Sequence, residues 1–136
     1  PPLYPGARAV VEALAGRDDL LLGVATGKSR RGLDHVLAAH GLAGAFVTTQ
    51  VADDHPSKPH PAMLLAALDR TGVDAAAAAM IGDTEYDMQM GRAAGVATIG
   101  VGWGYHPPDR LGAAADRIIH AFGELPAALD DLWRQA

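Results

Sequence analysis

Three short stretches of the sequence carry the residue types that phosphate and metal chemistry requires. GVATGKS contains Thr26 and Gly27 after an apolar run, and SKPHP contains Lys58. GDTEYD contains Asp83 and Asp87. A hydroxyl and a backbone amide can donate to phosphate oxygens, a lysine balances their charge, and carboxylates attract a divalent cation. Taken together, these groups predict a site for a phosphoryl group and Mg²⁺.

GVATGKS also ends like the phosphate-binding loop of nucleotide-hydrolysing proteins, but its glycine spacing differs. That loop places four residues between its first glycine and the Gly-Lys pair. Counting back from Gly27 puts Leu22 where the first glycine should stand, and Gly23 is one residue too close. Because a shorter loop directs its amides differently, we do not expect a nucleotide-binding loop. Lys28 and Ser29 are instead expected to be solvated or helix-capping residues.

The acidic residues of GDTEYD have two interpretations, and the sequence leaves both open. Asp83 and Asp87 lie one helical turn apart on one face, where they could share a Mg²⁺ ion completed by waters and phosphate oxygens. Acidic residues in the first turn of a helix also cap its free amides and complement its dipole. An EF-hand calcium loop is excluded, because Met88 stands where that loop needs glycine.

Lys58 lies in a loop with prolines at positions 56, 59 and 61. Such a stiff loop holds an ammonium in place with less entropy lost on binding, although a lone loop lysine is usually a surface residue. Thr26 and Gly27 taken alone are more often a turn than a site. His55 and His60 flank Lys58, but the sequence has no histidine cluster with the spacing of zinc ligands.

Apolar runs alternate with amphipathic segments along the chain, which predicts an α/β fold. Helices are expected over residues 7–15, 29–41, 61–72, 85–94 and 125–133, and strands over 20–25, 46–49, 78–82, 96–101 and 116–120. The strands are continuously apolar, which indicates a parallel sheet covered by helices on both faces. Because ligands bind beyond the carboxyl ends of such strands, Thr26, Lys58 and Asp83 are expected to converge there.

Length and composition exclude several classes of function. The 136 residues suit one domain, and a net charge of −5 with scattered Lys and Arg argues against nucleic acid or an anionic membrane as a partner. The absence of cysteine removes disulfides and thiolate catalysis. No apolar stretch approaches the ~20 residues of a membrane span, and the opening PPLYPG does not resemble a signal peptide. We therefore expect a soluble, cytoplasmic protein.

The ordered motifs resemble those of the haloacid-dehalogenase-like (HAD) hydrolases, and within them the phosphoglycolate-phosphatase-like branch. LLLGVATGKS is similar to the family's second motif, SKPHP to its third and MIGDTEYDMQMGRAAG to its fourth, while GVGWGYHPPDRL is similar to the branch's next segment. The resemblance covers essentially the whole chain. It implies a Rossmann-like three-layer sandwich with a parallel sheet, and a Mg²⁺-dependent phosphatase that hydrolyses a small phosphate monoester through an aspartyl-phosphate.

The resemblance also implies a role for each candidate residue. Thr26 and Gly27 would bind the phosphoryl group of a small phosphorylated metabolite, and Lys58 would offset charge on the nucleophile and the phosphate. Asp83 would ligate Mg²⁺, and Asp87 would support it. Outside these motifs, three aromatic residues could line the mouth of the pocket, although such residues more often serve packing: Tyr86, Trp103 and Tyr105.

One family motif has no counterpart in this sequence. Family members begin with a strand ending in Asp-x-Asp, whose first Asp is the nucleophile, and no Asp-x-Asp occurs here. We therefore expect residues 1–136 to be a partial core domain without the first strand and the cap, and to be inactive alone.

In the family, the missing first strand lies between the strands that carry Thr26 and Asp83. Its absence is expected to leave two inner sheet edges that self-association or an N-terminal segment could cover. The alternative function is a non-catalytic phosphate-binding or interaction module.

Overall fold

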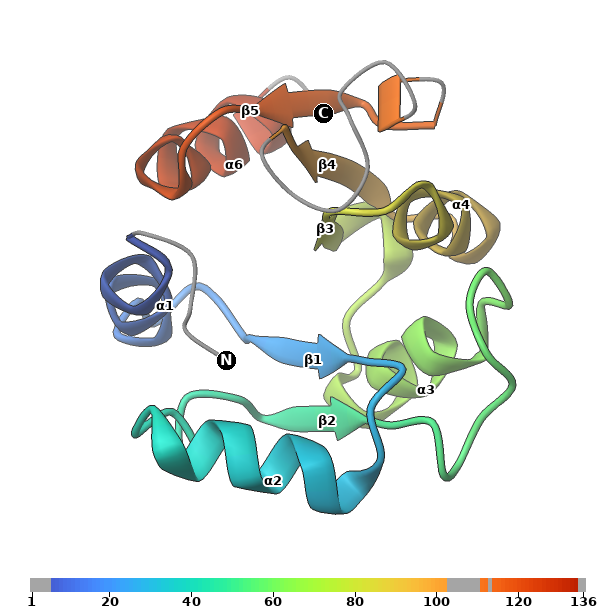
Figure 1. Ribbon diagram of the computed structural model, residues 1–136. Coiled ribbons are helices and arrows are strands. Elements are labelled where there is room, and N and C mark those ends of the chain that lie inside the picture. The colour runs from blue at the N-terminus through green and yellow to red at the C-terminus, as the bar shows by residue number, and fades with distance from the viewer. Residues whose placement is uncertain (1–5, 103–110, 113, 135–136) are drawn as a thin grey trace.

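The computed structural model describes residues 6–102, 111–112 and 114–134, and within them helices and strands alternate as expected (Figure 1). Trp103 and Tyr105 lie outside the described residues. The helices are α1 (Ala7–Ala15), α2 (Arg30–Ala39), α3 (Ala62–Thr71), α4 (Glu85–Ala94) and α6 (Leu125–Arg134). The strands are β1 (Gly23–Ala25), β2 (Thr48–Gln50), β3 (Ala79–Gly82), β4 (Ala97–Val101) and β5 (Arg117–Ile119). Two short 3₁₀ turns cover Ala75–Ala77 and Phe122–Glu124.

The helix ends follow signals that are local in the sequence. Ser29 caps α2, because its hydroxyl oxygen accepts a hydrogen bond from the Gly32 amide at 3.1 Å. Past the ends of α2, α3 and α4, glycines adopt φ values of 68°, 69° and 81°, in the left-handed region that glycine enters at little cost. Pro61 stands at the N-cap of α3, one position before the first helical turn where we expected it.

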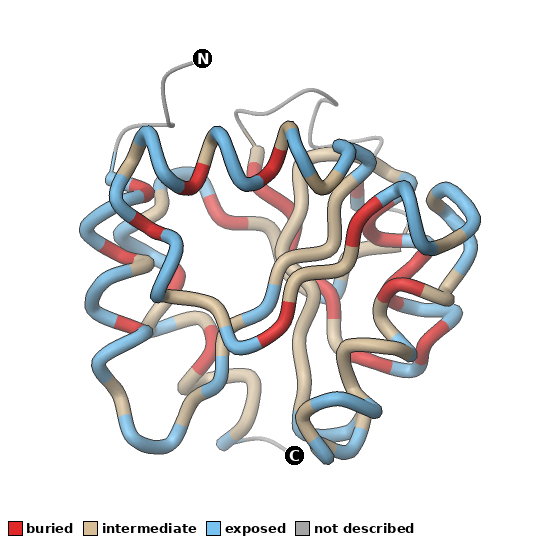
Figure 2. The backbone as a smooth tube through the Cα atoms, turned by 90° about the horizontal axis from the view of Figure 1, so that it is seen from below, coloured by how far each residue is buried: buried red, intermediate tan, exposed pale blue. Residues whose placement is uncertain are grey.

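The strands form the middle layer of a three-layer arrangement. Helices α1, α2 and α6 cover one side and helices α3 and α4 the other (Figure 1). Leu14 of α1 shares a buried cluster with Leu129 of α6 and Ile99 of β4, and Leu33 of α2 clusters with Val51 after β2. Buried positions recur along the helices with exposed positions between them (Figure 2). The predicted α/β, Rossmann-like fold with parallel strands is therefore confirmed.

The middle layer is divided into two sheets. β1 pairs with β2, and β3, β4 and β5 pair in that order, every pair being parallel. Among the described residues no strand lies between β1 and β3, so their facing edges have no strand partner. This division agrees with the expected pair of open inner edges, and the two edges have not closed onto each other.

The first two strands differ from the predicted ranges. The apolar run over residues 20–25 becomes a strand only over Gly23–Ala25, although the Val47 amide donates to the Leu22 carbonyl at 2.8 Å. β2 begins at Thr48, two residues later than the predicted segment 46–49. Apolar composition identified both strands, but pairing with a neighbour decides where a strand begins and ends.

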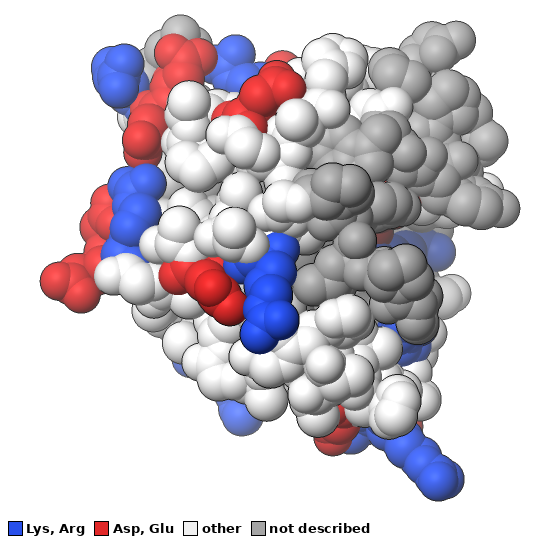
Figure 3. Space-filling model, turned by 60° about the vertical axis from the view of Figure 1, so that its left-hand side comes forward, with Lys and Arg blue, Asp and Glu red and all other residues white. Residues whose placement is uncertain are grey.

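Charged side chains of both signs lie beside one another on the face shown in Figure 3. Arg17 connects the turn after α1 to helix α6. Its Nη2 lies 2.8 Å from Asp19 Oδ2 and 3.2 Å from Asp130 Oδ1. The hydrogen bonds from the Arg17 guanidinium lower the pKa of Asp19 below its ordinary value of 3.8.

A membrane-spanning helix was not expected from the sequence. Among the described residues, every helix is too short or too polar to span a bilayer.

We expect Arg17→Met to return the pKa of Asp19 to its ordinary range, as measured by NMR titration. Because the folded-state pKa is depressed, the carboxylate contributes stability above pH 3.8 and loses that contribution as pH falls through the folded value. The stability difference between wild type and variant should therefore be larger at pH 6 than at pH 2, and small at both because the pair is exposed. Arg8→Met, which removes the exposed Arg8–Glu12 pair, is the control and should leave Asp19 unchanged. If the pKa of Asp19 were the same in Arg17→Met as in wild type, Arg17 would not be the cause of the lowered pKa.

Candidate functional site

The closest contact among the candidate residues is an ion pair between Lys58 and Asp87. Lys58 Nζ lies 2.5 Å from Asp87 Oδ1, and the two side chains are 22% and 6% exposed. A carboxylate this well buried is tolerated when a cation and hydrogen bonds satisfy it. The pair joins the proline-rich loop after β2 to the first turn of α4, which are 29 residues apart in the sequence.

Asp87 also caps the helix to which it belongs. Its amide donates to Thr84 Oγ1 at 3.1 Å, and its Oδ2 accepts from the Thr84 amide at 3.3 Å, so the two residues form a capping box. The capping interpretation of this acidic residue is therefore confirmed. Because Oδ1 faces Lys58 and Oδ2 faces Thr84, the carboxylate is held in one orientation.

Gly82 ends β3 at a place where no side chain fits. A Cβ atom added there would collide with Asp87 Cβ, and would lie 2.5 Å from its Oδ2 and 2.6 Å from its Cγ. The missing side chain lets strand β3 pass close to the buried carboxylate. Asp83 follows directly, in the turn between β3 and α4, and is partly exposed. A partly exposed carboxylate beside a buried one is accessible to a cation from solvent.

The turn after β1 is anchored to the segment that follows β2. The Thr26 amide donates to the Gln50 carbonyl at 3.0 Å, and the Ala52 amide donates to the Lys28 carbonyl at 3.0 Å. Thr26 Oγ1 accepts from the Lys28 amide at 3.1 Å, which leaves the hydroxyl proton available to a ligand. A Cβ added to Gly27 would meet no atom within 4 Å, so the space beside this residue is open.

Several polar contacts beside the site were not anticipated. Arg30 of α2 donates through Nη1 to Thr49 Oγ1 at 2.5 Å and through Nη2 to the Thr49 carbonyl at 2.8 Å. Asp53 Oδ1 accepts from the Arg30 amide at 2.9 Å. His55 Nε2 lies 2.7 Å from Gln50 Oε1. Gln50 belongs to no motif, and its place at the carboxyl end of β2 was the one signal that could have found it.

The second histidine of the lysine loop has a structural role. His60 Nδ1 accepts from the Ala62 amide at 3.1 Å, at the start of α3. This contact orients the beginning of the helix that follows the lysine loop. Tyr86, the described member of the aromatic group, is 44% exposed, and its part in lining a pocket mouth stays a prediction.

The candidate residues are brought together only in part. Lys58 contacts Asp87, Asp83 precedes the same helix, and the turn containing Thr26 is hydrogen-bonded to the start of the lysine loop through Lys28. β1 and β3, which end just before Thr26 and Asp83, belong to separate sheets. The site therefore has two halves, one after β1 and one after β3, and the Lys58–Asp87 pair links the loop after β2 to the second half.

The donor set suits Mg²⁺ better than a metal that needs many protein ligands. In the described part of the chain no three His, Cys, Asp or Glu side chains are arranged to hold a metal ion. Mg²⁺ typically takes one or two carboxylates and completes its shell with waters and phosphate oxygens. Asp83 and Asp87 can supply that number of carboxylates, and a carboxylate oxygen that already accepts one hydrogen bond retains a second lone pair.

Comparison with known proteins identifies the family to which this chain is similar. Residues 1–101 match the model of the family described as haloacid dehalogenase-like hydrolase. The chain is 42% identical over 129 residues to the probable phosphatase IndB of Dickeya dadantii, covering 93% of this chain and 55% of that protein. It is 40% identical over 116 residues to a phosphoglycolate phosphatase of Rhodospirillum rubrum, covering 83% of this chain and 48% of that protein.

A solved structure shows the same arrangement of elements. The crystal structure of a predicted phosphoglycolate phosphatase from Haemophilus somnus 129pt superposes with a TM-score of 0.85 at 26% identity, covering 93% of this chain and 57% of that one. The chain thus spans about half the length of the relatives that it matches. One family accounts for the match over most of the chain, for the identity to these relatives and for the shared fold. The chain belongs to the haloacid dehalogenase-like hydrolases.

Proposed function

We propose that this chain is the phosphate-binding and magnesium-binding part of a phosphatase that hydrolyses a small phosphorylated metabolite through an aspartyl-phosphate. The observation that carries the proposal is the buried Lys58–Asp87 pair beside the Gly82–Asp83 turn. The names of two similar proteins, a probable phosphatase and a phosphoglycolate phosphatase, support the same reaction class. The nucleophile would come from a strand that is not among these 136 residues.

Lys58 would act on both the nucleophile and the phosphate. An ammonium group has three N–H donors, and Asp87 Oδ1 takes one of them. Two donors remain for oxygens that gain negative charge during phosphoryl transfer. Asp87 is a positioning residue in this proposal, because it holds the lysine without touching the substrate.

Thr26 and Gly27 would bind the other side of the phosphoryl group. The Thr26 hydroxyl can donate its proton while it accepts from the Lys28 amide, and the space beside Gly27 is open to an anion. Mg²⁺ would be held by Asp83 with the support of Asp87, and would neutralise charge on phosphate oxygens. Each of the two halves of the site would thus provide its own contacts to one phosphoryl group.

We expect inorganic phosphate to bind the chain in the presence of Mg²⁺, and Thr26→Val to weaken that binding by about tenfold, because a hydrogen bond to a charged group is lost without a change in shape. Isothermal titration calorimetry measures both affinities. Lys28→Met is the matched control in the same turn, and an exposed, screened ammonium should change the affinity by less than about threefold. If the turn were a nucleotide-binding loop, Lys28 would contact the phosphate, and Lys28→Met would weaken phosphate binding by more than threefold.

Two results would contradict this proposal. One is equal phosphate affinity of wild type, Thr26→Val and an Asp83→Asn variant. The other is metal-dependent turnover of p-nitrophenyl phosphate by the 136-residue chain alone, since that would require a nucleophile within these residues.

A further inference from the structure

Gln50, at the carboxyl end of β2, contacts both segments that carry candidate phosphate-binding residues. Its backbone carbonyl accepts from the Thr26 amide at 3.0 Å, in the turn after β1. Its side-chain Oε1 lies 2.7 Å from Nε2 of His55, in the loop that carries Lys58. Gln50 therefore connects the Thr26 turn with the lysine loop through one backbone contact and one side-chain contact.

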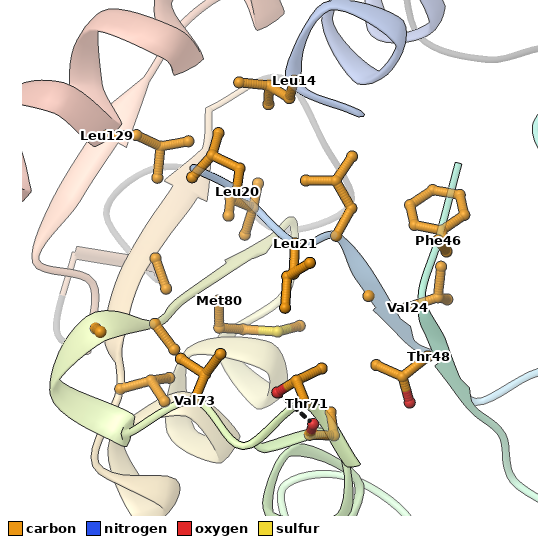
Figure 4. A pocket seen from close by; sticks show the side chains of 18 of the residues that line it. Leu14, Leu20, Leu21, Val24, Phe46, Thr48, Thr71, Val73, Met80 and Leu129 are labelled. Carbon is orange, nitrogen blue, oxygen red and sulfur yellow. Dashed lines mark hydrogen bonds between the residues drawn. The ribbon is translucent and has the colours of Figure 1, made fainter. Parts of the chain in front are cut away.

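A buried threonine holds the Gln50 side chain in place. Gln50 Nε2 donates to Thr48 Oγ1 at 2.8 Å, and Thr48 is 7% exposed. A Cβ atom added to Gly23 of β1 would lie 2.9 Å from Thr48 Cγ2, so the threonine methyl group is packed against the neighbouring strand. Thr48 also borders an apolar pocket between β1 and β3 (Figure 4). Because a packed β-branched side chain has little freedom at χ1, the Gln50 amide has a rigid support.

The Gln50 side chain points to the face of the sheet that α3 covers. Thr49, which precedes Gln50, contacts Arg30 of α2 on the opposite face. Side chains alternate between the two faces along a strand, so Thr48 and Gln50 point toward the α3 side. The lysine loop leads into α3, which packs against β2 (Figure 1). The contact with His55 therefore ties this loop to the sheet on the side where its helix packs.

The direction of these hydrogen bonds decides which nitrogen of His55 carries a proton. Because Gln50 Nε2 donates to Thr48, the Gln50 oxygen faces the imidazole. A carbonyl oxygen only accepts, so His55 Nε2 is the donor and carries the hydrogen. The neutral ring is therefore the Nε2–H tautomer, and a protonated ring would keep the same contact.

The segment between His55 and Lys58 is short and stiff. Pro56 follows His55 directly, and Pro59 follows Lys58. Proline fixes one of its two backbone angles, so little of a displacement at His55 is absorbed before it reaches Lys58. In the proposed site, Lys58 Nζ contacts both Asp87 Oδ1 and a phosphate oxygen. Holding His55 therefore narrows the range of positions that Nζ takes.

We propose that Gln50 and His55 are positioning residues for Lys58. Gln50 holds His55, and His55 holds the start of the lysine loop. The spacing between the Thr26 turn and this loop is kept because Gln50 contacts both. Neither side chain touches the phosphoryl group. The inference rests on the proposed function, because it gives these two residues a part in the same phosphate site.

The first test is the binding of inorganic phosphate to the 136-residue chain with Mg²⁺ at pH 8, measured by isothermal titration calorimetry. His55→Leu should weaken binding about fivefold, because Lys58 loses its fixed position. His55→Gln should stay within about twofold of wild type, since its amide can donate to Gln50 as the imidazole does. His35→Leu, at an exposed position of α2, is the control and should leave the affinity unchanged. In a Lys58→Met background, His55→Leu should change the affinity by less than about twofold, because the lysine through which it acts is gone.

Two further measurements need no ligand. Long-range proton–nitrogen NMR at about pH 8.5, where histidine side chains are ordinarily neutral, should show the Nε2–H tautomer of His55 alone. Gln50→Leu should give a mixture of the two tautomers. The coupling between Lys58 and Asp87 is measured by a double-mutant cycle of urea stabilities with Lys58→Met and Asp87→Asn. This coupling should fall to about half or less in a His55→Leu background, since the lysine is held less firmly there.

Several results would overturn the inference. They are an Nδ1–H tautomer of His55, equal phosphate affinity of wild type and His55→Leu, failure of His55→Gln to retain binding, an equal effect of His55→Leu without Lys58, and an unchanged Lys58–Asp87 coupling. If the wild type bound no phosphate, the proposed function would fail instead. The tautomer and the coupling would then decide the positioning role by themselves.

Discussion

Lys58→Met is expected to lower the free energy of unfolding by about 3 kcal/mol, because it leaves a buried carboxylate without its cation. Asp87 is 6% exposed, and its Oδ1 would lose the lysine that lies 2.5 Å away. Urea denaturation at neutral pH, followed by circular dichroism, measures the change as a lower midpoint with an unchanged slope.

The double variant Lys58→Met/Asp87→Asn tests this cause. Asparagine is neutral, and its side-chain oxygen can still accept from the Thr84 amide as Asp87 Oδ2 does. The double variant should therefore recover most of the stability lost in the single one. Arg8→Met removes an ion pair of similar type from the surface and should cost less than about 0.5 kcal/mol. If Lys58→Met cost no more than Arg8→Met, the buried pair would not stabilise the fold.

Gly82→Ala is expected to cost about 2 kcal/mol, because the added methyl group overlaps a side chain that is held on two sides. Asp87 cannot move away without breaking its contacts with Lys58 and Thr84. The same denaturation experiment measures the loss. In addition, Lys58→Met should cost less in the Gly82→Ala background than in wild type, since the ion pair is already disturbed there.

Gly44→Ala is the matched control for this substitution. A Cβ at Gly44 would meet no atom within 4 Å, and the residue is exposed, so the change should stay within about 0.5 kcal/mol. Equal costs at Gly82 and Gly44 would show that the close approach of β3 to Asp87 has no energetic consequence.

Local features were predicted well because their causes are local. Helix α1 has the predicted bounds, and Ser29 caps α2 as its type and position indicated. Gly41 and Gly95 mark helix ends, since the left-handed conformation there is a property of the glycine backbone itself. Alternating strands and helices with continuously apolar strands sufficed to predict a parallel sheet between two helical layers.

The strand boundaries and the contacts of the site depended on segments that are distant in the sequence. The apolar run over residues 20–25 is a strand over only three residues, because one edge pairs with β2 and the other has no strand partner among the described residues. Spacing alone left Asp87 open to a metal role or a capping role, and did not reveal that Lys58 would pair with it. Asp87 is buried where α4 packs against β3, and its charge is balanced by Lys58, which is 29 residues away in the sequence.

The sequence by itself therefore determined the fold class, the helix ends and the three motifs that carry Thr26, Lys58 and Asp83, because composition, spacing and backbone preference act over a few residues. Tertiary structure alone decided that Lys58 satisfies the buried carboxylate of Asp87, and that Arg17 in the turn after α1 pairs with Asp130 of α6. Each of these depends on which distant segments come into contact, and that is set by the packing of the whole chain.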